Sequence, residues 1–269
     1  MTDPAPARPR ASRTFLALAA LLVLGGAAFG WWWEARKAAA PQPADAALES
    51  NLAAAGIDGR EREAIEGLVR AYILDHPEII PEAVDRLQQK EAAAQIAPLR
   101  GALETPFPGA VMGNPAGKLT LVSFTDYACT YCRRSVGDLD AVIAANPDLR
   151  VVIRELPIIA PESAPAARMA LAAAAQGKYS AFHKAMFAGD RPGTASIAAA
   201  ARAAGLDLAA ASTFAAAPGT DGELARNVDL AKRLGINGTP AWIVGDQMLA
   251  GAVGKERLQE AVTAARKAG

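Results

Sequence analysis

The stretch Phe124-Thr125-Asp126-Tyr127-Ala128-Cys129-Thr130-Tyr131-Cys132-Arg133-Arg134 decides the fold of this chain. It holds the only two cysteines, three positions apart, and it begins at the end of an apolar run, residues 119–124, that predicts a β-strand. The residues that follow carry apolar side chains at helical spacing and predict a helix. A strand that brings two cysteines to the first turn of a helix is typical of thiol–disulfide exchange.

The spacing of Cys129 and Cys132 suits a reversible disulfide. Residues i and i+3 of a helix have Cα atoms about 5 Å apart, a separation that a disulfide tolerates. The positive end of the helix dipole stabilises a thiolate at Cys129, and Cys132 lies one turn deeper, at the place of a resolving thiol. A zinc site is the competing interpretation, but it needs about four protein ligands. Because His76 and His183 are distant and follow no ligand spacing, we predict a dithiol redox enzyme without a metal.

The composition narrows the remaining function classes. The chain has 269 residues, with 28 lysines and arginines against 28 aspartates and glutamates, and 52% of its residues are hydrophobic. This length allows one large or two modest domains, and the apolar content excludes a wholly disordered chain. Without a basic excess or a basic run, the sequence gives no indication of a nucleic-acid partner.

The amino-terminal region predicts a membrane anchor. Residues 14–33 are uncharged and largely apolar, which is enough helix to cross about 30 Å of hydrocarbon. Arginines precede this segment, and the tryptophans at 31–33 close it as an interfacial aromatic belt does. We therefore expect residues 1–13 to be a cytoplasmic tail and the rest of the chain to lie outside the inner membrane. A cleaved signal peptide is the alternative, because the alanines at 38–40 offer small residues to a peptidase.

Two segments separate this anchor from the cysteine-containing domain. Residues 34–47 are rich in alanine and proline without an apolar period, and they predict a tether. Residues 48–100 predict a helical segment in which Asp58 and Glu61 form a capping box. One helix face carries an apolar stripe made of Ile65, Leu68, Val69, Tyr72 and Ile73. Such short helices bury too little surface to fold alone, so the stripe packs either on the next domain or on further copies of itself.

Residues 101–269 predict an α/β domain. Strands are expected at 119–124 and 149–156, on either side of the dithiol helix, and this order makes them a parallel pair with a crossover. A hairpin with Gly245-Asp246 as its turn follows late in the chain, and an amphipathic helix closes the domain. The order predicts a thioredoxin fold with an inserted α-helical subdomain, preceded by a short α-helical segment and an N-terminal transmembrane helix.

The inserted subdomain is expected at about residues 161–218. Glycines and prolines break this alanine-rich region into several helices. Phe182, Met186 and Phe187 share one helix face, so we expect them in the core of the subdomain. His183 is expected to face solvent beside Lys184.

Three motifs together resemble the DsbA family of extracytoplasmic disulfide oxidoreductases, from about residue 106 to the end. They are Phe124-Thr125-Asp126-Tyr127-Ala128-Cys129-Thr130-Tyr131-Cys132-Arg133, then Arg154-Glu155-Leu156-Pro157-Ile158 with Pro161-Glu162-Ser163, and Gly238-Thr239-Pro240. Residues 69–91 resemble the N-terminal helical segment of the copper-sensitivity-suppressor (ScsC-like) branch of the family. That likeness implies a segment that can drive oligomerisation and favour disulfide isomerase activity.

The resemblance to the DsbA family also implies a role for each site residue. Cys129 is the nucleophile, Cys132 is the resolving thiol, and Pro240 is a cis-proline that faces the dithiol. The backbone around Thr239 pairs with an extended substrate. No cofactor is implied beyond the redox-active disulfide of the two cysteines.

Two features depart from the family's strongest oxidants and from thioredoxins. The dipeptide between the cysteines is Thr130-Tyr131, which lacks the histidine of those oxidants and predicts a less oxidising couple. Ser123 stands where thioredoxins place a buried acid, six residues before the nucleophile, and Asp126 is a nearer candidate for proton transfer. Arg133 and Arg134 either favour the thiolate electrostatically or are solvated helix charges.

These features lead to one function and one alternative. We expect a membrane-anchored periplasmic thiol–disulfide oxidoreductase that forms or isomerises disulfides in exported proteins through Cys129 and Cys132. Its expected partners are cysteine-containing exported proteins, a membrane redox protein of the DsbB or DsbD type, and further copies of itself through the N-terminal helices. The alternative is a periplasmic protein that captures copper or another soft metal with the reduced dithiol. The sequence leaves oxidase, isomerase and reductase open.

Overall fold

The computed structural model describes residues 43–268, and the chain divides into two compact units. The first unit ends at Pro77 and the second begins at Glu78. Among the residues that are described, no helix is both long and apolar enough to cross a membrane. The expected anchor at residues 14–33 lies outside the described residues.

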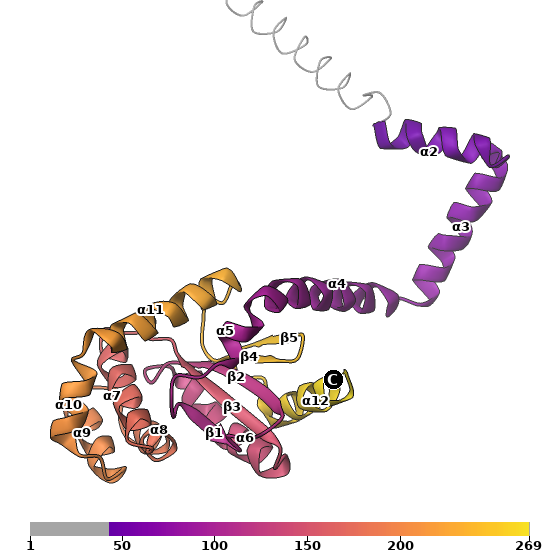
Figure 1. The fold of residues 1–269 in the computed structure, drawn as a ribbon. Helices are drawn as coiled ribbons and strands as arrows, with labels where there is room; N and C mark the ends of the chain where they lie inside the picture. Colours follow the sequence, from indigo (N-terminus) through magenta and orange to yellow (C-terminus); the bar gives the residue numbers. More distant parts are fainter. Residues whose placement is uncertain (1–42, 269) are drawn as a thin grey trace, which may run out of the picture. The chain divides into compact units, whose positions relative to one another are not determined.

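Helices α2 (Pro43–Ala54) and α3 (Gly59–Asp75) belong to the first unit (Figure 1). The capping box at the start of α3 is present: the Asp58 carboxylate accepts from the Glu61 N–H, and the Glu61 carboxylate accepts from the Asp58 N–H. The apolar stripe of α3 is exposed, and Leu68 leaves 70% of its surface accessible. No residue of α3 is buried, although the Tyr72 ring lies 4.6 Å from the His76 ring at the end of the helix.

The expected tether ends earlier than predicted, because residues 43–47 are already helical. Pro43 stands at the start of α2, where its missing N–H leaves no helical hydrogen bond unmade. Several alanines follow Pro43 in α2, and alanine has the highest helix propensity of all residues. Residues 34–42 lie outside the described part of the chain.

The second unit contains a five-stranded sheet and the helices around it. Its elements are α4 (Ile79–Ile96), the 3-10 helix η1 (Ala97–Leu99), α5 (Arg100–Glu104), β1 (Val111–Gly113), β2 (Leu119–Thr125), α6 (Thr130–Ala145), β3 (Leu149–Glu155), α7 (Ser163–Ala175), α8 (Tyr179–Ala188), α9 (Thr194–Ala203), α10 (Leu208–Ala215), α11 (Pro218–Arg233), β4 (Ala241–Val244), β5 (Gln247–Ala250) and α12 (Gly254–Ala268). The strand order is β1-β3-β2-β4-β5, in which β2 and β3 are parallel and the other pairs antiparallel.

The sheet agrees with the sequence prediction except at its edge. The parallel pair, the β4–β5 hairpin and its Gly245-Asp246 turn are present where expected, and Gly245 has the positive φ of 57° that such a turn requires. Strand β1 was not predicted, because its three residues are too few to carry an alternating pattern. Gly113 ends that strand with a φ of 72°, where a Cβ would lie 2.6 Å from the Leu149 carbonyl oxygen.

Helices cover both faces of the sheet, and alternate strand residues point into two cores. On one face Leu121 and Val151 pack with α6 and α12 through Leu139 and Val262. On the other face, side chains of residues 96–103 and of α11 with the residue after it pack on the sheet. They include Ile96, Leu103, Leu230 and Leu234. The end of the predicted helical segment therefore packs on the α/β domain itself.

Helices α7 to α10 lie together at one end of the sheet as the inserted subdomain (Figure 1). Phe182, Met186 and Phe187 are buried there, as predicted. The arrangement is a thioredoxin-like α/β fold with a helical insertion, preceded by an N-terminal helical segment. The insertion places α8 against α6, so the dithiol helix contacts both parts of the domain.

Candidate active site

The two cysteines lie where β2 ends and α6 begins. Cys129 is the N-cap residue of α6, with an extended backbone, and its Sγ accepts a hydrogen bond from the Cys132 N–H at 3.4 Å. Both side chains are free thiols and both are largely buried, with 6% of Cys129 and 4% of Cys132 accessible. The unpaired N–H groups of the first helical turn thus face the Cys129 sulfur, as the sequence predicts.

The loop before β4 closes the other side of Cys129. The Cys129 thiol donates to the Thr239 carbonyl oxygen at 3.1 Å, and the Thr239–Pro240 peptide bond is cis. The Thr239 hydroxyl is buried and has no hydrogen-bond partner within the described part of the chain. Residues 235–241 and 248–251 line a hollow of about 230 Å³ beside this loop.

The two thiols have opposite acidities. A hydrogen bond from the Cys132 thiol and the first N–H groups of α6 lower the pKa of Cys129 to about 5, against the effect of burial, and the Thr239 hydroxyl adds to this lowering when it turns to the thiolate. Burial and the neighbouring Cys129 raise the pKa of Cys132 far above its ordinary value. Near neutral pH, Cys129 is therefore the thiolate and Cys132 the thiol, which is the division that stepwise exchange requires.

Asp126 joins the dithiol turn to the segment after β3. Its Oδ1 accepts from the Ala128 N–H at 2.8 Å, and its Oδ2 accepts from the Ile158 and Ile159 N–H groups, each at 2.8 Å. Three backbone N–H groups therefore hold the Asp126 carboxylate, which links the dithiol turn to residues 158–159. We call this arrangement the Asp126 clasp, and the sequence did not indicate it. It fixes two exposed isoleucines beside the dithiol turn.

The residues between and after the cysteines differ in exposure. Thr130 and Tyr131 are exposed, and the Arg134 guanidinium lies 4.5 Å from the centre of the Tyr131 ring. Arg133 is not simply a solvated charge, because its guanidinium has backbone partners at the end of another helix. It donates to the carbonyl oxygens of Phe187, Gly189 (2.6 Å) and Asp190 (3.3 Å), at the end of α8. Arg133 therefore fastens the inserted subdomain to the active-site helix.

A buried polar cluster lies behind the dithiol turn, and sequence reasoning missed it. Glu155, at the end of β3, accepts through Oε1 from the hydroxyls of Tyr127 (3.0 Å) and Tyr179 (2.6 Å). The Nδ1 atom of His183 lies 3.2 Å from the Tyr127 oxygen and 3.4 Å from the Tyr179 oxygen. The prediction that His183 faces solvent is wrong, because 97% of its surface is covered and it faces the same side as Tyr179, one helical turn before it.

Comparison with known proteins shows the family to which the α/β domain belongs. Residues 120–263 match the DSBA-like thioredoxin domain family. The chain belongs to this family. Residues 61–94 match a second family, the copper resistance protein ScsC N-terminal domain, at the position where the sequence suggested the ScsC-like branch. DsbA-family membership and the dithiol geometry identify the α/β unit as a thiol–disulfide oxidoreductase domain.

Solved structures of similar proteins agree with this assignment. A thioredoxin-like oxidoreductase from Silicibacter pomeroyi is 40% identical, with a TM-score of 0.60 over 63% of this chain and 99% of its own. A linker-deletion mutant of ScsC from Proteus mirabilis is 30% identical, with a TM-score of 0.61 over 79% of this chain and 98% of its own. A periplasmic thioredoxin-like protein from Salmonella enterica serovar Typhimurium is 31% identical, with a TM-score of 0.55 over 62% and 95%.

This chain matches only a small part of the curated relatives, which are longer proteins. An 81-residue part of this chain is 38% identical to the Na(+)/H(+) antiporter NhaA 1 of Mycobacterium, and the match spans 13% of the antiporter's length. That likeness covers 29% of this DsbA-family chain, so it carries no statement about transport.

The DsbA-family domain has a buried acid on β3, next to the strand that carries Ser123. Ser123 is buried without a charge, whereas Glu155 comes from the neighbouring parallel strand, where it pairs with Thr125. Burial raises the pKa of Glu155 to about 8, against the lowering effect of the two tyrosine hydroxyls. Burial also lowers the pKa of His183 to about 3, so the imidazole is neutral. The sequence signal for this acid was a carboxylate at the end of a strand whose residues 151–153 are apolar.

Replacing Glu155 by glutamine is expected to change how stability depends on pH. Below about pH 4.5 the carboxyl is protonated in the folded and unfolded chains, so the variant and the parent differ little. Between pH 4.5 and 8 the unfolded chain loses this proton while the folded chain keeps it, and the parent loses stability as pH rises. Relative to the parent, Glu155→Gln should gain up to about 5 kcal/mol by pH 9, by the 1.36 kcal/mol that each pKa unit represents.

Urea unfolding at pH 5, 7 and 9 measures this difference. Glu256→Gln, at an exposed position of α12, is the matched control and should follow the parent at each pH. A constant difference between Glu155→Gln and the parent from pH 5 to 9 would show that Glu155 is ionised throughout.

Proposed function

We propose that this protein is a periplasmic thiol–disulfide oxidoreductase that acts on the cysteines of exported proteins, with Cys129 as nucleophile and Cys132 as resolving thiol. The observation that carries the proposal is the opposite acidity of two thiols held three positions apart at a helix start. Similar proteins of known structure include one described as periplasmic, which supports this location.

The chemistry follows from the two thiols. The Cys129 thiolate attacks one sulfur of a substrate disulfide, a mixed disulfide forms, and the second substrate sulfur leaves as a thiolate that takes up a proton. The Cys132 thiol then loses its proton and attacks the Cys129 sulfur, which gives the Cys129–Cys132 disulfide and a reduced substrate. Oxidation of a substrate dithiol is the reverse sequence. In isomerisation a substrate thiol resolves the mixed disulfide in place of Cys132.

One loop and the start of α6 flank the position that a substrate sulfur takes. The Thr239 carbonyl and Pro240 stand on one side of Cys129, where an extended substrate can pair with the Thr239 backbone. The buried Thr239 hydroxyl, which lacks a partner in the described residues, can donate to the thiolate once Cys129 is ionised. Thr130 and Tyr131 are exposed at the start of α6, on the other side of Cys129. Because they lie between the two cysteines, they adjust the reduction potential of the Cys129–Cys132 disulfide.

The N-terminal residues complete the proposal. Residues 14–33 anchor the protein in the inner membrane, with residues 1–13 in the cytoplasm and a membrane protein of the DsbB or DsbD type as redox partner. The exposed stripe of α3 joins copies of the chain, which brings several active sites together. The match of residues 61–94 to the ScsC N-terminal domain supports this arrangement and favours isomerisation over oxidation.

Reactivation of scrambled ribonuclease in a glutathione buffer tests the choice between isomerase and oxidase. The full chain in detergent is expected to reactivate it, and Leu68→Lys in the α3 stripe should lower the rate severalfold by separating the copies. Arg70→Ala, two positions along the same helix and outside the stripe, is the control. Rapid oxidation of a reduced peptide with no reactivation of ribonuclease would make the protein an oxidase.

Capture of a soft metal by the reduced dithiol is the second candidate, favoured by the copper-resistance family matched at residues 61–94. Residues 43–268 contain no group of three or more His, Cys, Asp or Glu side chains arranged to hold a metal ion. A site would therefore consist of the two thiolates alone. Stoichiometric Cu(I) binding by a protein without thiol exchange would favour this function over the first.

A further inference from the structure

The inserted subdomain contains an apolar groove that the dithiol chemistry does not use. It lies between α7, α9, α10 and the start of α11, and its volume is about 620 Å³. Small and apolar side chains line it: Met169, Ile197, Ala198, Ala201, Leu208 and Ala215. Alanines at three of these positions leave space that larger residues would fill. A groove of this size, with a mostly apolar lining, is in the range of ligand sites.

The groove starts close to the active-site surface. Ile158 and Ile159 are exposed, by 44% and 47%, and the Asp126 clasp holds them beside the dithiol turn. Glu162, three residues later, already lines the groove. Three residues of extended chain span at most about 11 Å, so the two apolar surfaces are near neighbours.

The charges at the groove favour an uncharged or cationic occupant. Its lining holds two carboxylates, on Glu162 and Asp221, and one cation, Arg168. The Arg168 guanidinium is paired with Asp221 at 2.6 Å, so it is neutralised locally. An anionic lipid would meet the Glu162 carboxylate without a free cation in the lining. An apolar segment of a polypeptide carries no such charge.

We propose that this groove is a second binding site for substrate, which holds an apolar segment of the same unfolded polypeptide whose cysteine reacts at Cys129. This inference rests on the proposed function and specifies its substrate class as unfolded chains with exposed apolar segments. Holding such a segment raises the local concentration of the attached cysteine at the dithiol. The enzyme thereby distinguishes unfolded chains from small thiols.

Two peptides of equal length test the proposal with the oxidised full chain. Both carry the same cysteine pair, and one carries a Leu-Ile-Val segment where the other has Ser and Gly, at spacings of four to twelve residues. Each reaction transfers two electrons from the peptide dithiol to the Cys129–Cys132 disulfide. We expect the apolar peptide to react with a kcat/KM about tenfold higher at the best spacing, through a lower KM, which corresponds to about 1.4 kcal/mol.

Two variants on neighbouring positions of α9 separate the groove from general effects. Ala198→Phe fills the groove from a partly buried position and should reduce the tenfold preference to nearly one. Ala199→Phe puts the same side chain on the exposed face outside the lining and should keep the preference. If Ala198→Phe fails to fold, photo-crosslinking of the apolar peptide to the parent protein takes its place, with crosslinks expected in α7, α9 and α10.

The possible failures of this test are distinguishable. Equal kcat/KM for the two peptides with the parent protein, or a preference that survives Ala198→Phe, overturns the groove proposal and leaves the proposed function intact. Absence of reaction with both peptides overturns the proposed function itself. Saturable binding of a fluorescent fatty acid that Ala198→Phe abolishes, without any peptide preference, assigns the groove to a lipid instead.

Discussion

Replacement of Cys129 by serine is expected to abolish thiol–disulfide exchange, with a rate reduced at least about a thousandfold, the scale on which loss of a covalent nucleophile acts. The parent side chain is a thiolate near neutral pH, because its pKa is lowered to about 5. A serine hydroxyl at the same N-cap position stays protonated and forms no disulfide. Oxidation of a dithiol peptide and reactivation of scrambled ribonuclease measure the loss.

Replacement of Cys132 by serine should have a different result. Cys129 remains able to attack, but the mixed disulfide has no internal thiol to resolve it, so covalent complexes accumulate on non-reducing gels. Thr130→Ser, at the exposed position beside the nucleophile, is the matched control and should retain exchange within a fewfold. Full activity of Cys129→Ser, or adducts in that variant and none in Cys132→Ser, would reverse the assigned order of the thiols.

The sequence predicted the parts of this domain that local patterns encode. The sequence predicted the dithiol at a strand–helix junction because three patterns follow one another along β2 and α6. They are an apolar run, a pair of cysteines and apolar residues at helical spacing. The β4–β5 hairpin was readable from its Gly245-Asp246 turn. Each of these features depends on neighbours within about ten residues.

The parts that were missed depend on contacts between distant segments. His183 sits beside Lys184, which suggested solvent, yet its Nδ1 lies 3.2 Å from the hydroxyl oxygen of Tyr127, in the turn before α6. Arg133 looked like a solvated or thiolate-stabilising charge because its acceptors lie at the end of α8, more than fifty residues later. No periodicity in the sequence reports such pairings.

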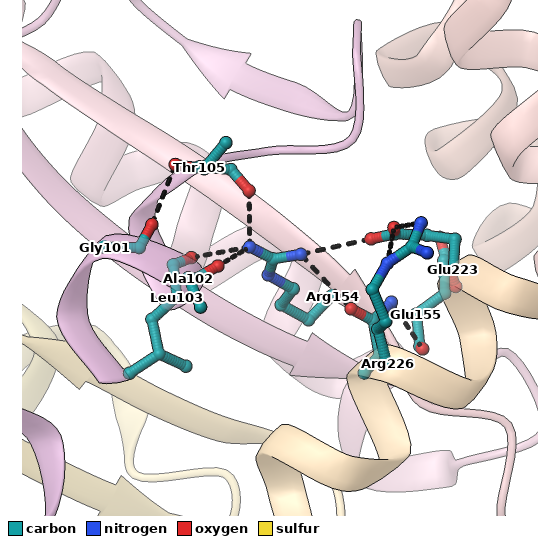
Figure 2. A network of polar contacts seen from close by, with 9 residues as sticks. Gly101, Ala102, Leu103, Thr105, Arg154, Glu155, Glu223 and Arg226 are labelled. Carbon is teal, nitrogen blue, oxygen red and sulfur yellow. Dashed lines mark hydrogen bonds and ion pairs between the residues drawn. The ribbon is translucent and has the colours of Figure 1, made fainter. Parts of the chain in front are cut away.

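Arg154 is the clearest case of a role that appears only in the folded chain. The sequence places it in an apolar strand, where an arginine contradicts the pattern of β3. In the structure its guanidinium donates to the carbonyl oxygens of Ala102, Leu103 (3.0 Å) and Thr105, at the end of α5 (Figure 2). Its other nitrogen pairs with Glu223 at 3.1 Å and donates to Asn227 at 3.2 Å, both on α11.

One buried cation thus joins three parts of the domain: α5, the end of β3 and α11. Asn227 also donates to the backbone oxygen of Glu155, the buried acid behind the dithiol turn. The two terminal nitrogens of the planar guanidinium, Nη1 and Nη2, serve these five acceptors, while Nε has no partner within the described part of the chain. A lysine, with three donors on one atom, could not serve all five acceptors. Only 5% of the Arg154 side chain and 6% of the Glu223 side chain are accessible, so water cannot replace either partner.

Replacing Arg154 by methionine is therefore expected to lower the free energy of unfolding by about 3–5 kcal/mol, the range for breaking a buried ion pair. The loss has two sources: the Glu223 carboxylate stays buried without its inner partner, and the carbonyl oxygens at the end of α5 lose their donor. Arg226→Met removes the other partner of Glu223, at an arginine that is 66% exposed, and should lower it by less than about 1 kcal/mol.

Urea unfolding of the two variants at one pH makes the comparison direct, because each removes one arginine from the same carboxylate. Arg154→Lys is a third variant, which keeps the positive charge but loses the planar guanidinium. Its free energy of unfolding should lie between those of Arg154→Met and the parent. Similar small losses for Arg154→Met and Arg226→Met would mean that the buried pair contributes no more than the exposed one. In that case the cost of removing Arg154 from water would offset the attraction between Arg154 and Glu223. The apolar contacts of Leu103 would then hold α5 in place.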